Sequence, residues 1–283
     1  MLKIAFSPVY KYELPPGHRF PMEKYELLPE QLLYEGTVEE ENFFHPSQLS
    51  EEDILTTHSR AYWNKLKNLD LTRREEREIG FPVRSSLVDR GRYIAQGTLT
   101  GAEYAMKHGV AMNIAGGTHH SFPHKGEGFC IFNDIAIASN VLLREGKVRK
   151  ILIIDLDVHQ GNGNAHIFQG RPEVFTFSMH GERNYPLRKE KSDLDIGLPD
   201  GTGDREYLYV LEKQLDRLFS MHDPDLVFYQ SGVDVLETDK LGRLALSLRG
   251  CQRRDELVFQ ACRQKAVPVF VSMGGGYSER LSD

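Results

Sequence analysis

Short apolar runs alternate with amphipathic stretches over the second two thirds of the chain. Runs rich in β-branched residues predict strands at 110–114, 150–154, 174–177, 226–229 and 267–271. Amphipathic patterns with capping residues predict helices at 91–108, 133–145, 204–218 and 255–265. This alternation is typical of a parallel sheet that helices cover on both faces, so it predicts an α/β fold.

The first 90 residues lack this regular pattern. They contain seven prolines and two acidic patches, and they predict an irregular N-terminal part. Within it, short helices are expected at 22–28 and 53–66, and the charged run at 72–78 predicts a solvent-exposed helix or loop. We expect residues 1–283 to form a single domain, with its catalytic core at 91–283.

Composition narrows the class of protein. With 40% hydrophobic and 27% charged residues among 283, the chain is typical of a soluble globular protein. The sequence contains no run of 18 apolar residues, so it predicts no membrane-spanning helix. The net charge of −6 argues against nucleic-acid binding by bulk electrostatics. Three cysteines without CxxC spacing favour a reducing compartment. We therefore expect a cytoplasmic protein with no nucleic-acid or membrane partner.

Polar residues follow each of the five predicted strands. The carboxyl ends of parallel strands meet at one edge of a sheet, which is where ligands bind in such folds. The sequence therefore predicts one site built from five loops, which contain His119-His120, Asp155 to His159, His180, Asp234 and Gly274 to Tyr277.

A divalent metal site is one interpretation of these loops. Asp155, Asp157 and His159 alternate at a spacing of two, so their side chains share a face of an extended segment. Taken alone, the acids of such a segment could equally cap a nearby helix, and Asp234 alone could do the same. Together, Asp157, His159 and Asp234 provide three ligands and leave a position for water, which suits Zn²⁺ or Fe²⁺.

The remaining residues favour hydrolysis of an amide or ester. His119 and His120 can move protons near neutral pH, and the hydroxyl of Tyr277 can stabilise an oxyanion. A serine nucleophile is not indicated because GxSxG is absent, and the apolar neighbours of Cys130 are typical of a packing residue. The glycines at 274–276 lack the order of a phosphate-binding loop.

Four stretches carry a resemblance to a known family. They are AGGTHHSFPHKGEGFCIFNDIA (115–136), ILIIDLDVHQGNG (151–163), QSGVD (230–234) and MGGGY (273–277). In this order they resemble the zinc-dependent histone deacetylase superfamily. The stretches DVHQGNG, DVLETDKLGRLALS and RDELVF make the chain most similar to class IV histone deacetylases. The resemblance implies the arginase/deacetylase fold, a three-layer α/β/α domain with a mainly parallel sheet of about eight strands.

The resemblance also implies a role for each matching residue. Asp157, His159 and Asp234 match the zinc ligands, His119 and His120 the tandem histidines, and Tyr277 the tyrosine that polarises the scissile carbonyl. Asp155 matches the acid behind the first histidine. A structural K⁺ or Na⁺ ion is implied at Asp155, Asp157, His159, Ser178 and Met179. The walls of a substrate tunnel are implied at Gly128, Phe129 and Tyr185, with Leu241 at its rim.

Two features depart from the family pattern. Class I members have an aspartate at the position of Asn162, so the second histidine here lacks a carboxylate partner. Superfamily chains usually continue with another helix after the GGGY loop, whereas this sequence stops six residues after Tyr277. The resemblance therefore implies that a C-terminal helix is missing.

These observations predict a zinc-dependent deacetylase or deacylase. The enzyme would use a metal-activated water to remove an acetyl or longer acyl group from an acyl-lysine peptide or protein, or from a small acylated amine. The similarity to class IV implies that fatty acyl groups are accepted as well as acetyl. The alternatives are an arginase-like ureohydrolase or an acetylpolyamine amidohydrolase on the same fold, and a binding module without turnover. Leu241 argues against a polyamine substrate, because polyamine-specific members place a glutamate at that position.

Overall fold

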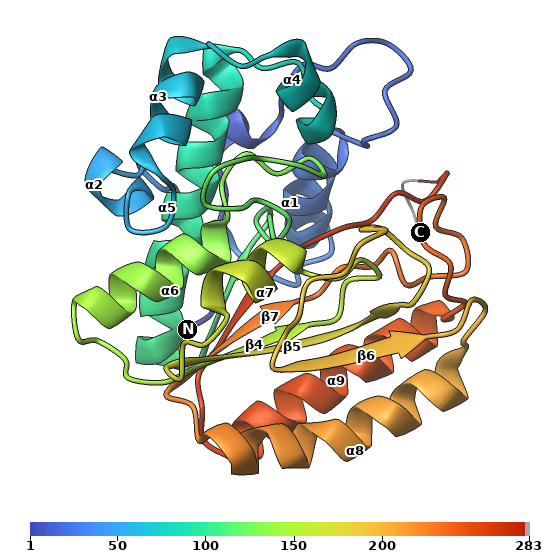
Figure 1. The fold of residues 1–283 in the computed structure, drawn as a ribbon. Coiled ribbons are helices and arrows are strands. Elements are labelled where there is room, and N and C mark those ends of the chain that lie inside the picture. Colours follow the sequence, from blue (N-terminus) through green and yellow to red (C-terminus); the bar gives the residue numbers. More distant parts are fainter. Residues whose placement is uncertain (281–283) are drawn as a thin grey trace.

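A single eight-stranded sheet forms the centre of the molecule (Figure 1). The computed structural model describes residues 1–280. The order of the strands in the sheet is β2-β1-β3-β8-β7-β4-β5-β6, and every neighbouring pair is parallel. The strands are β1 (Lys3–Ala5), β2 (Phe43–Phe44), β3 (Val110–Asn113), β4 (Ile151–Asp155), β5 (Val174–Gly181), β6 (Leu194–Leu198), β7 (Leu226–Gln230) and β8 (Val269–Ser272).

Helices cover both faces of this sheet. Figure 1 shows α8 and α9 on one face and α5 and α6 on the other, with α2 to α4 stacked beyond α5. This arrangement confirms the predicted three-layer α/β/α architecture. The α-helices are α1 (Lys24–Tyr34), α2 (Glu51–Ile54), α3 (Arg60–Asn68), α4 (Arg73–Ile79), α5 (Ser85–His108), α6 (Asp134–Arg144), α7 (Asn162–Phe168), α8 (Asp204–His222) and α9 (Leu248–Gln264).

Alternate residues of the central strands belong to two hydrophobic cores. On β4, Ile151 and Ile153 pack into the core that contains α5 and α6, whereas Leu152 and Ile154 pack into the core that contains α8 and α9. Successive side chains of a strand point to opposite faces, so a strand buried on both faces must be apolar throughout. This is why the strand at 150–154 could be recognised as a continuous apolar run.

The N-terminal part is more regular than the sequence predicts. The expectation that residues 1–90 are irregular is wrong. β1 and β2 extend the sheet at one edge, and four helices, α1 to α4, follow β1 in the sequence before α5 begins. These strands are only three and two residues long, too short to show a periodic pattern. The helix expected at 53–66 is divided into α2 and α3, since the hydroxyl of Ser59 caps a new helix by accepting from the amide of Tyr62.

Two further elements were not predicted, and α9 is longer than expected. β6 is an edge strand whose exposed residues alternate with buried ones in a polar, glycine-containing stretch. α7 contains glycine and asparagine, which are poor helix formers, but the amides of Gly163 and Asn164 donate to the carbonyl of His119. α9 begins at Leu248 rather than at 255, because Ser247 caps it. Among the described residues, no helix is long and apolar enough to cross a bilayer.

Candidate metal centre and catalytic site

Four neighbouring strands deliver the predicted chemical groups to one edge of the sheet. β3, β8, β7 and β4 are adjacent, and their carboxyl ends lead into the loops of His119, Tyr277, Asp234 and Asp157. The fifth predicted loop is different, because β5 continues to Gly181 and His180 lies on the strand. The buried His180 bonds through its Nδ1 atom to the hydroxyl of Ser178 at 2.9 Å. The structure thus brings together the residues of four of the five predicted loops.

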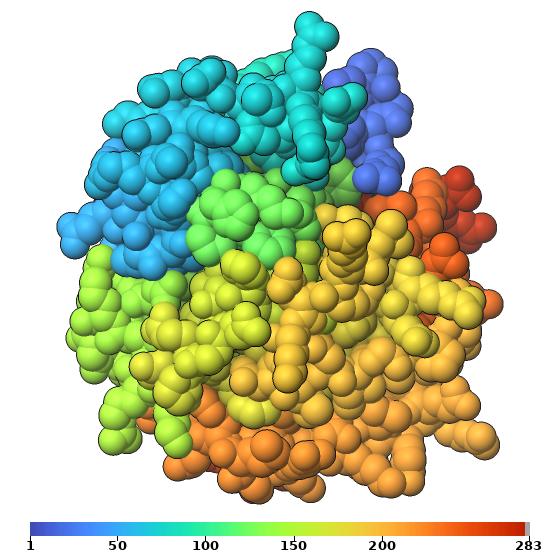
Figure 2. All heavy atoms as spheres, viewed as in Figure 1, coloured from blue at the N-terminus to red at the C-terminus, as the bar shows by residue number. Residues whose placement is uncertain are grey.

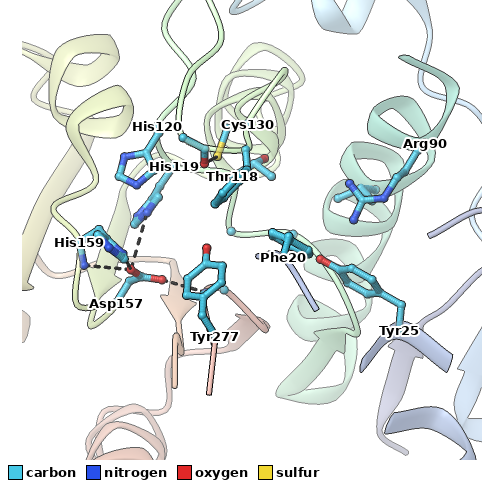
Figure 3. A pocket seen from close by; sticks show the side chains of 17 residues that line it. Phe20, Tyr25, Arg90, Thr118, His119, His120, Cys130, Asp157, His159 and Tyr277 are labelled. Carbon is cyan, nitrogen blue, oxygen red and sulfur yellow. Dashed lines mark hydrogen bonds and ion pairs between the residues drawn. The ribbon is translucent and has the colours of Figure 1, made fainter. Parts of the chain in front are cut away.

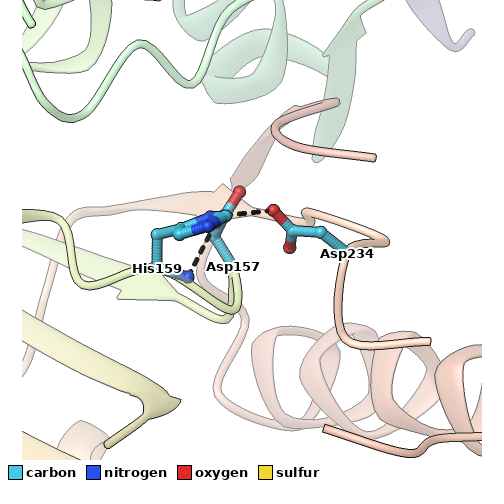
Figure 4. A group of neighbouring side chains, drawn as sticks. All are labelled: Asp157, His159 and Asp234. Atoms are coloured by element: carbon cyan, nitrogen blue, oxygen red, sulfur yellow. Dashed lines mark hydrogen bonds and ion pairs between the residues drawn. The ribbon is translucent and has the colours of Figure 1, made fainter. Parts of the chain in front are cut away.

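Asp157, His159 and Asp234 form a compact buried group (Figure 4). One potential ligand atom of each lies within 4.8 Å of the others. The Nδ1 atom of His159 lies 3.0 Å from Oδ1 of Asp157 and 3.1 Å from Oδ2 of Asp234. Ligand atoms of a tetrahedral zinc site with bonds of about 2.0 Å are separated by about 3.3 Å. The donor types and their spacing therefore fit a divalent metal ion.

Backbone amides and glycines hold the two carboxylates. Asp157 accepts from the amide of Gly275 at 2.9 Å, and Asp234 accepts from the amide of Val158 at 2.9 Å. A Cβ atom at Gly275 would lie 2.0 Å from the carboxylate of Asp234, and one at Gly232 would lie 2.3 Å from that of Asp157. The glycines of the MGGGY and QSGVD stretches thus permit the backbone to approach these carboxylates closely.

His119 is paired with the acid behind it. Its Nδ1 atom donates to Oδ2 of Asp155 at 2.6 Å, and both side chains are buried. Burial alone would lower the pKa of His119, but the carboxylates of Asp155 and Asp157 outweigh it and raise this pKa to about 9. His119 is therefore the imidazole that favours its charged form.

His120 is held in the opposite state by a chain of hydrogen bonds. Asn162 donates through Nδ2 to the buried carboxylate of Glu127 at 2.7 Å, so its Oδ1 atom accepts from Nδ1 of His120 at 2.6 Å. This leaves Nε2 of His120 with a free lone pair. Burial, and then the neighbouring imidazoles of His119 and His159, lower the pKa of His120 well below its usual value. His120 has the protonation state of a general base.

Tyr277 faces these imidazoles across a cavity (Figure 3). Its amide donates to Asp239 at 2.6 Å, and its ring packs edge-on against His159 and Phe20, with ring centroids 6.3 and 5.8 Å away. Burial, followed by the charges of Asp234 and Asp157, raises the pKa of Tyr277 well above 10. Its hydroxyl therefore keeps its proton and can donate a hydrogen bond.

The four predicted tunnel residues line one open cavity above this group. It has a volume of about 530 Å³ and reaches down to His120, His159 and Tyr277. Gly128, Phe129, Tyr185 and Leu241 all line it. Phe129 has a φ of 68°, which is unusual for a residue with a side chain, and its amide donates to the carbonyl of Ile79 at 2.7 Å. The end of α4 thus fixes one wall of the cavity.

Several residues of the site were not predicted. The carboxylate oxygen Oε1 of Glu127 accepts from both Nδ2 of Asn162 and the hydroxyl of Tyr185. The available signal in the sequence was an acid between two glycines in GEGF. Phe20, from the N-terminal part, packs against Phe129 and Tyr277. Its position depends on tertiary packing, and the only signal was the GHRFP stretch.

Arg254 was also missed as a supporting residue. Its guanidinium is fully buried and donates to the carbonyls of Gly232 at 2.6 Å, Ser231 at 3.0 Å and Leu156 at 3.3 Å. These carbonyls belong to the two loops that carry the candidate metal ligands. Arg254 therefore connects the loop after β4 to the loop after β7 through hydrogen bonds.

The residues expected to bind a monovalent cation lie on neighbouring strands. Asp155, the last residue of β4, is the register partner of Ser178 on β5, and Met179 follows it. Asp155 also accepts from the amide of Asp157 at 3.2 Å. The K⁺ or Na⁺ ion itself stays a prediction. Cys130 is buried, and burial raises the pKa of its thiol, which supports its interpretation as a packing residue.

Comparison with known proteins identifies the family. A family model described as the histone deacetylase domain matches residues 18–282. An uncharacterized protein of Picosynechococcus is 44% identical over 99% of this chain and 93% of its own, and histone deacetylase 2 of Arabidopsis thaliana is 32% identical over 92% and 70%. The crystal structure of a histone deacetylase homolog from Aquifex aeolicus covers 98% of this chain and 79% of its own, with 26% identity and a TM-score of 0.85. The chain belongs to the histone deacetylase family.

Proposed function

We propose that this protein hydrolyses the amide of an acylated lysine ε-amino group, in a peptide or protein or in a related small amine. The family makes the chain a metal-dependent deacetylase, and the substrate is our inference. The observation that carries it is the buried group of Asp157, His159 and Asp234. Two of its members, Asp157 and His159, line a cavity that His120 and Tyr277 also line. An amide that reaches this floor would meet all the groups that its hydrolysis needs.

Zn²⁺ is the metal we propose for this group, with Fe²⁺ as the alternative that the same donors accept. A bound divalent ion supplies Lewis-acid polarisation of the acyl carbonyl and lowers the pKa of water. Asp157, His159 and Asp234 would hold it. They form the one group of three such ligands among residues 1–280, which favours a single metal over the two that an arginase-like reaction uses.

The residues around the metal group can carry out the proton transfers. His120 accepts the proton of the attacking water at Nε2, because Asn162 holds the proton on Nδ1. The hydroxyl of Tyr277 donates to the oxygen of the tetrahedral intermediate as the negative charge develops there. The proton on His120 then passes to the leaving amine as the C–N bond breaks, giving the carboxylate and free lysine. His119, charged beside Asp155, stabilises the negative charge.

The space at the floor favours short acyl groups. A cavity of about 40 Å³ is lined by Phe20, Tyr25, Arg90, Gly117 and Thr118 together with the catalytic group. This is room for about three waters. An acetyl group fits this space as it is, whereas the fatty acyl chains implied by the similarity to class IV require Phe20 and Tyr25 to move. An acyl-length series therefore distinguishes two expectations: acceptance of fatty acyl groups would support class IV membership, and declining rates would support selection by the small cavity.

Two finer points complete the proposal. We also propose a structural K⁺ or Na⁺ ion at Asp155, Asp157, His159, Ser178 and Met179, since Asp155 on β4 and Ser178 on β5 are register partners. We also retain the cytoplasm as the compartment, because Cys130, Cys251 and Cys262 are buried and form no disulfide within the described residues.

A single assay series tests the function. The protein is loaded with Zn²⁺ or Fe²⁺, the metal per chain is measured, and lysine peptides with acetyl, butyryl, octanoyl and myristoyl groups are compared. We expect about one metal per chain, turnover of the acetyl peptide, and declining rates for longer chains. SAHA, which a solved histone deacetylase homolog binds, is expected to inhibit. Release of urea from arginine, or two metals per chain, would favour the arginase-like alternative, and full metal loading without turnover would favour a binding module.

A further inference from the structure

Four arginines surround the mouth of the cavity that leads to the metal group. Arg19, Arg77, Arg183 and Arg243 are all exposed, and all line the 530 Å³ cavity. They come from four separate segments: the loop before α1, α4, the loop after β5 and the loop after β7. Figure 2 shows the N-terminal, α4 and 180s segments, in blue, teal and yellow, meeting on one face of the molecule.

The acids near these arginines do not balance their charge. Within residues 1–280, Arg19 and Arg77 form no ion pair, and Arg183 and Arg243 share one carboxylate, that of Asp200, at 3.9 and 3.2 Å. The acids that line the mouth have their own cations: Glu78 is paired with Arg74 at 2.9 Å, and the buried Glu127 with Lys125. Among the residues that line the cavity, four arginines thus face two acids, Glu78 and Glu127, although the whole chain has a net charge of −6.

The positive charge lies where the flanks of a substrate would lie. The guanidinium of Arg19 is 5.0 Å from the ring centroid of Phe129, a wall of the cavity, so it is adjacent to the entrance. An acylated lysine side chain is neutral and would enter between these walls, which leaves its neighbouring residues over the arginines. A cluster of one sign of charge around a cleft raises the local concentration of oppositely charged ligands, and arginine binds carboxylates in a bidentate manner.

We propose that the arginines at the mouth select acyl-lysine substrates with acidic flanking residues and disfavour those with basic flanking residues. The inference rests on the proposed deacylase function, which it extends from the acyl-lysine to its surroundings. Carboxylates two or three residues from the acyl-lysine would bind Arg19 and Arg77, the two of these four arginines that form no ion pair within residues 1–280.

Three acetyl-lysine peptides of equal length test this proposal, with Glu, Gln or Lys at the positions two and three residues away from the acetyl-lysine on both sides. We expect kcat/KM at low salt to be about tenfold higher for the Glu peptide than for the Lys peptide, with the difference mainly in KM. The difference should shrink between about 20 and 500 mM salt, since exposed charges are screened. In the double variant Arg19→Gln/Arg77→Gln it should fall to about twofold.

The matched control is Arg149→Gln/Arg263→Gln, which removes the same charge at the opposite edge of the sheet, before β4 and before β8. This variant should keep the tenfold preference. Turnover of all three peptides at equal kcat/KM, or an unchanged preference in the Arg19/Arg77 variant, would reject the inference and leave the deacylase function intact. Absence of turnover for every peptide by the metal-loaded protein would reject the deacylase function, and the inference with it.

Discussion

The strand-end loops and the N-terminal part contribute to the same cavity in different ways. The loops after β3, β4, β7 and β8 supply the groups with chemistry: imidazoles, carboxylates and a phenol. Residues 1–90 supply walls and charge: Phe20 beside Tyr277, Gly80 beside Phe129, and Arg19 and Arg77 at the mouth. The first region is held by backbone amides and buried acids, the second by aromatic packing and exposed side chains.

This difference separates catalysis from substrate choice. Groups that act on the reacting atoms need fixed positions, which the edge of a parallel sheet provides. Walls and rims determine which substrate reaches those atoms, and they can vary without disturbing the metal group. Changes in the strand-end loops should therefore lower kcat, and changes in residues 1–90 should mainly alter KM and selectivity.

Removal of a metal ligand should have the largest effect. In Asp157→Ala, His159→Ala or Asp234→Ala, one donor of the buried group is lost, so metal content should fall and turnover should drop by more than about 100-fold. Metal analysis and a deacetylation assay measure both quantities. The exposed Asp70→Ala provides the control. A variant of the three that retained its metal and its rate would contradict the assignment of that ligand.

The two histidines should respond unequally. His120 is the neutral imidazole with a free Nε2, whereas His119 is charged beside Asp155. His120→Ala should thus lower kcat by about 10²-fold to 10⁴-fold, as expected for a general base, and His119→Ala should lower it less. Steady-state kinetics at equal metal content decide the point. A larger loss in His119→Ala would assign the base to that residue instead.

Tyr277→Phe should lower kcat by about 10²-fold, because it removes only a hydroxyl that donates to the developing oxyanion. The fold and the metal content should persist, since the amide of Tyr277, not its hydroxyl, bonds to Asp239. Tyr209→Phe, on the exposed face of α8, is the matched control. A rate within about threefold of the wild type would show that Tyr277 only packs.

Exchanging the acid Glu127 and the amide Asn162 behind His120 should change the pH dependence of kcat/KM. Asn162→Asp alone would place two carboxylates together, because Asn162 contacts Glu127. In the double variant Asn162→Asp/Glu127→Gln the new amide can donate to the new carboxylate, so a hydrogen bond between the two positions is kept and the negative charge moves next to His120. A carboxylate stabilises the imidazolium and raises the pKa of His120, and a base acts only when it is neutral. The ascending limb of kcat/KM should therefore move to higher pH, by about one unit or more.

Glu127→Gln is the control for this exchange, since it removes the charge without placing one on Asn162. The ascending limb of its kcat/KM profile should remain at nearly the same pH as in the wild type. An unshifted limb in the double variant, with its metal retained, would exclude His120 as the base whose ionisation controls the rate.

The sequence was most informative where local pattern and position in the fold coincide. The central strands could be predicted because burial on both faces requires continuous apolar runs, and Asp157 or Tyr277 could be identified because polar groups directly follow such runs. β1 and β2 were missed because two or three residues show no periodicity. Glu127 and the arginines at the mouth were missed because their role depends on distant segments that only folding brings together.

The smallest expected effect concerns the contact between Gly80, at the end of α4, and the ring of Phe129 in the cavity wall. Gly80 has a φ of 83°, and a Cβ atom there would lie 2.9 Å from Cε1 of Phe129, whereas Gly36 has a φ of 67° and no atom within 4 Å of such a Cβ. Gly80→Ala and Gly36→Ala should each destabilise the protein by about 1–2 kcal/mol through the backbone, which denaturant unfolding measures. Only Gly80→Ala should displace the ring of Phe129, so it alone should raise the KM for acetyl-lysine peptides, by about threefold, with kcat and metal content unchanged. Equal KM values in the two variants would show that the contact between α4 and Phe129 does not determine how the substrate binds.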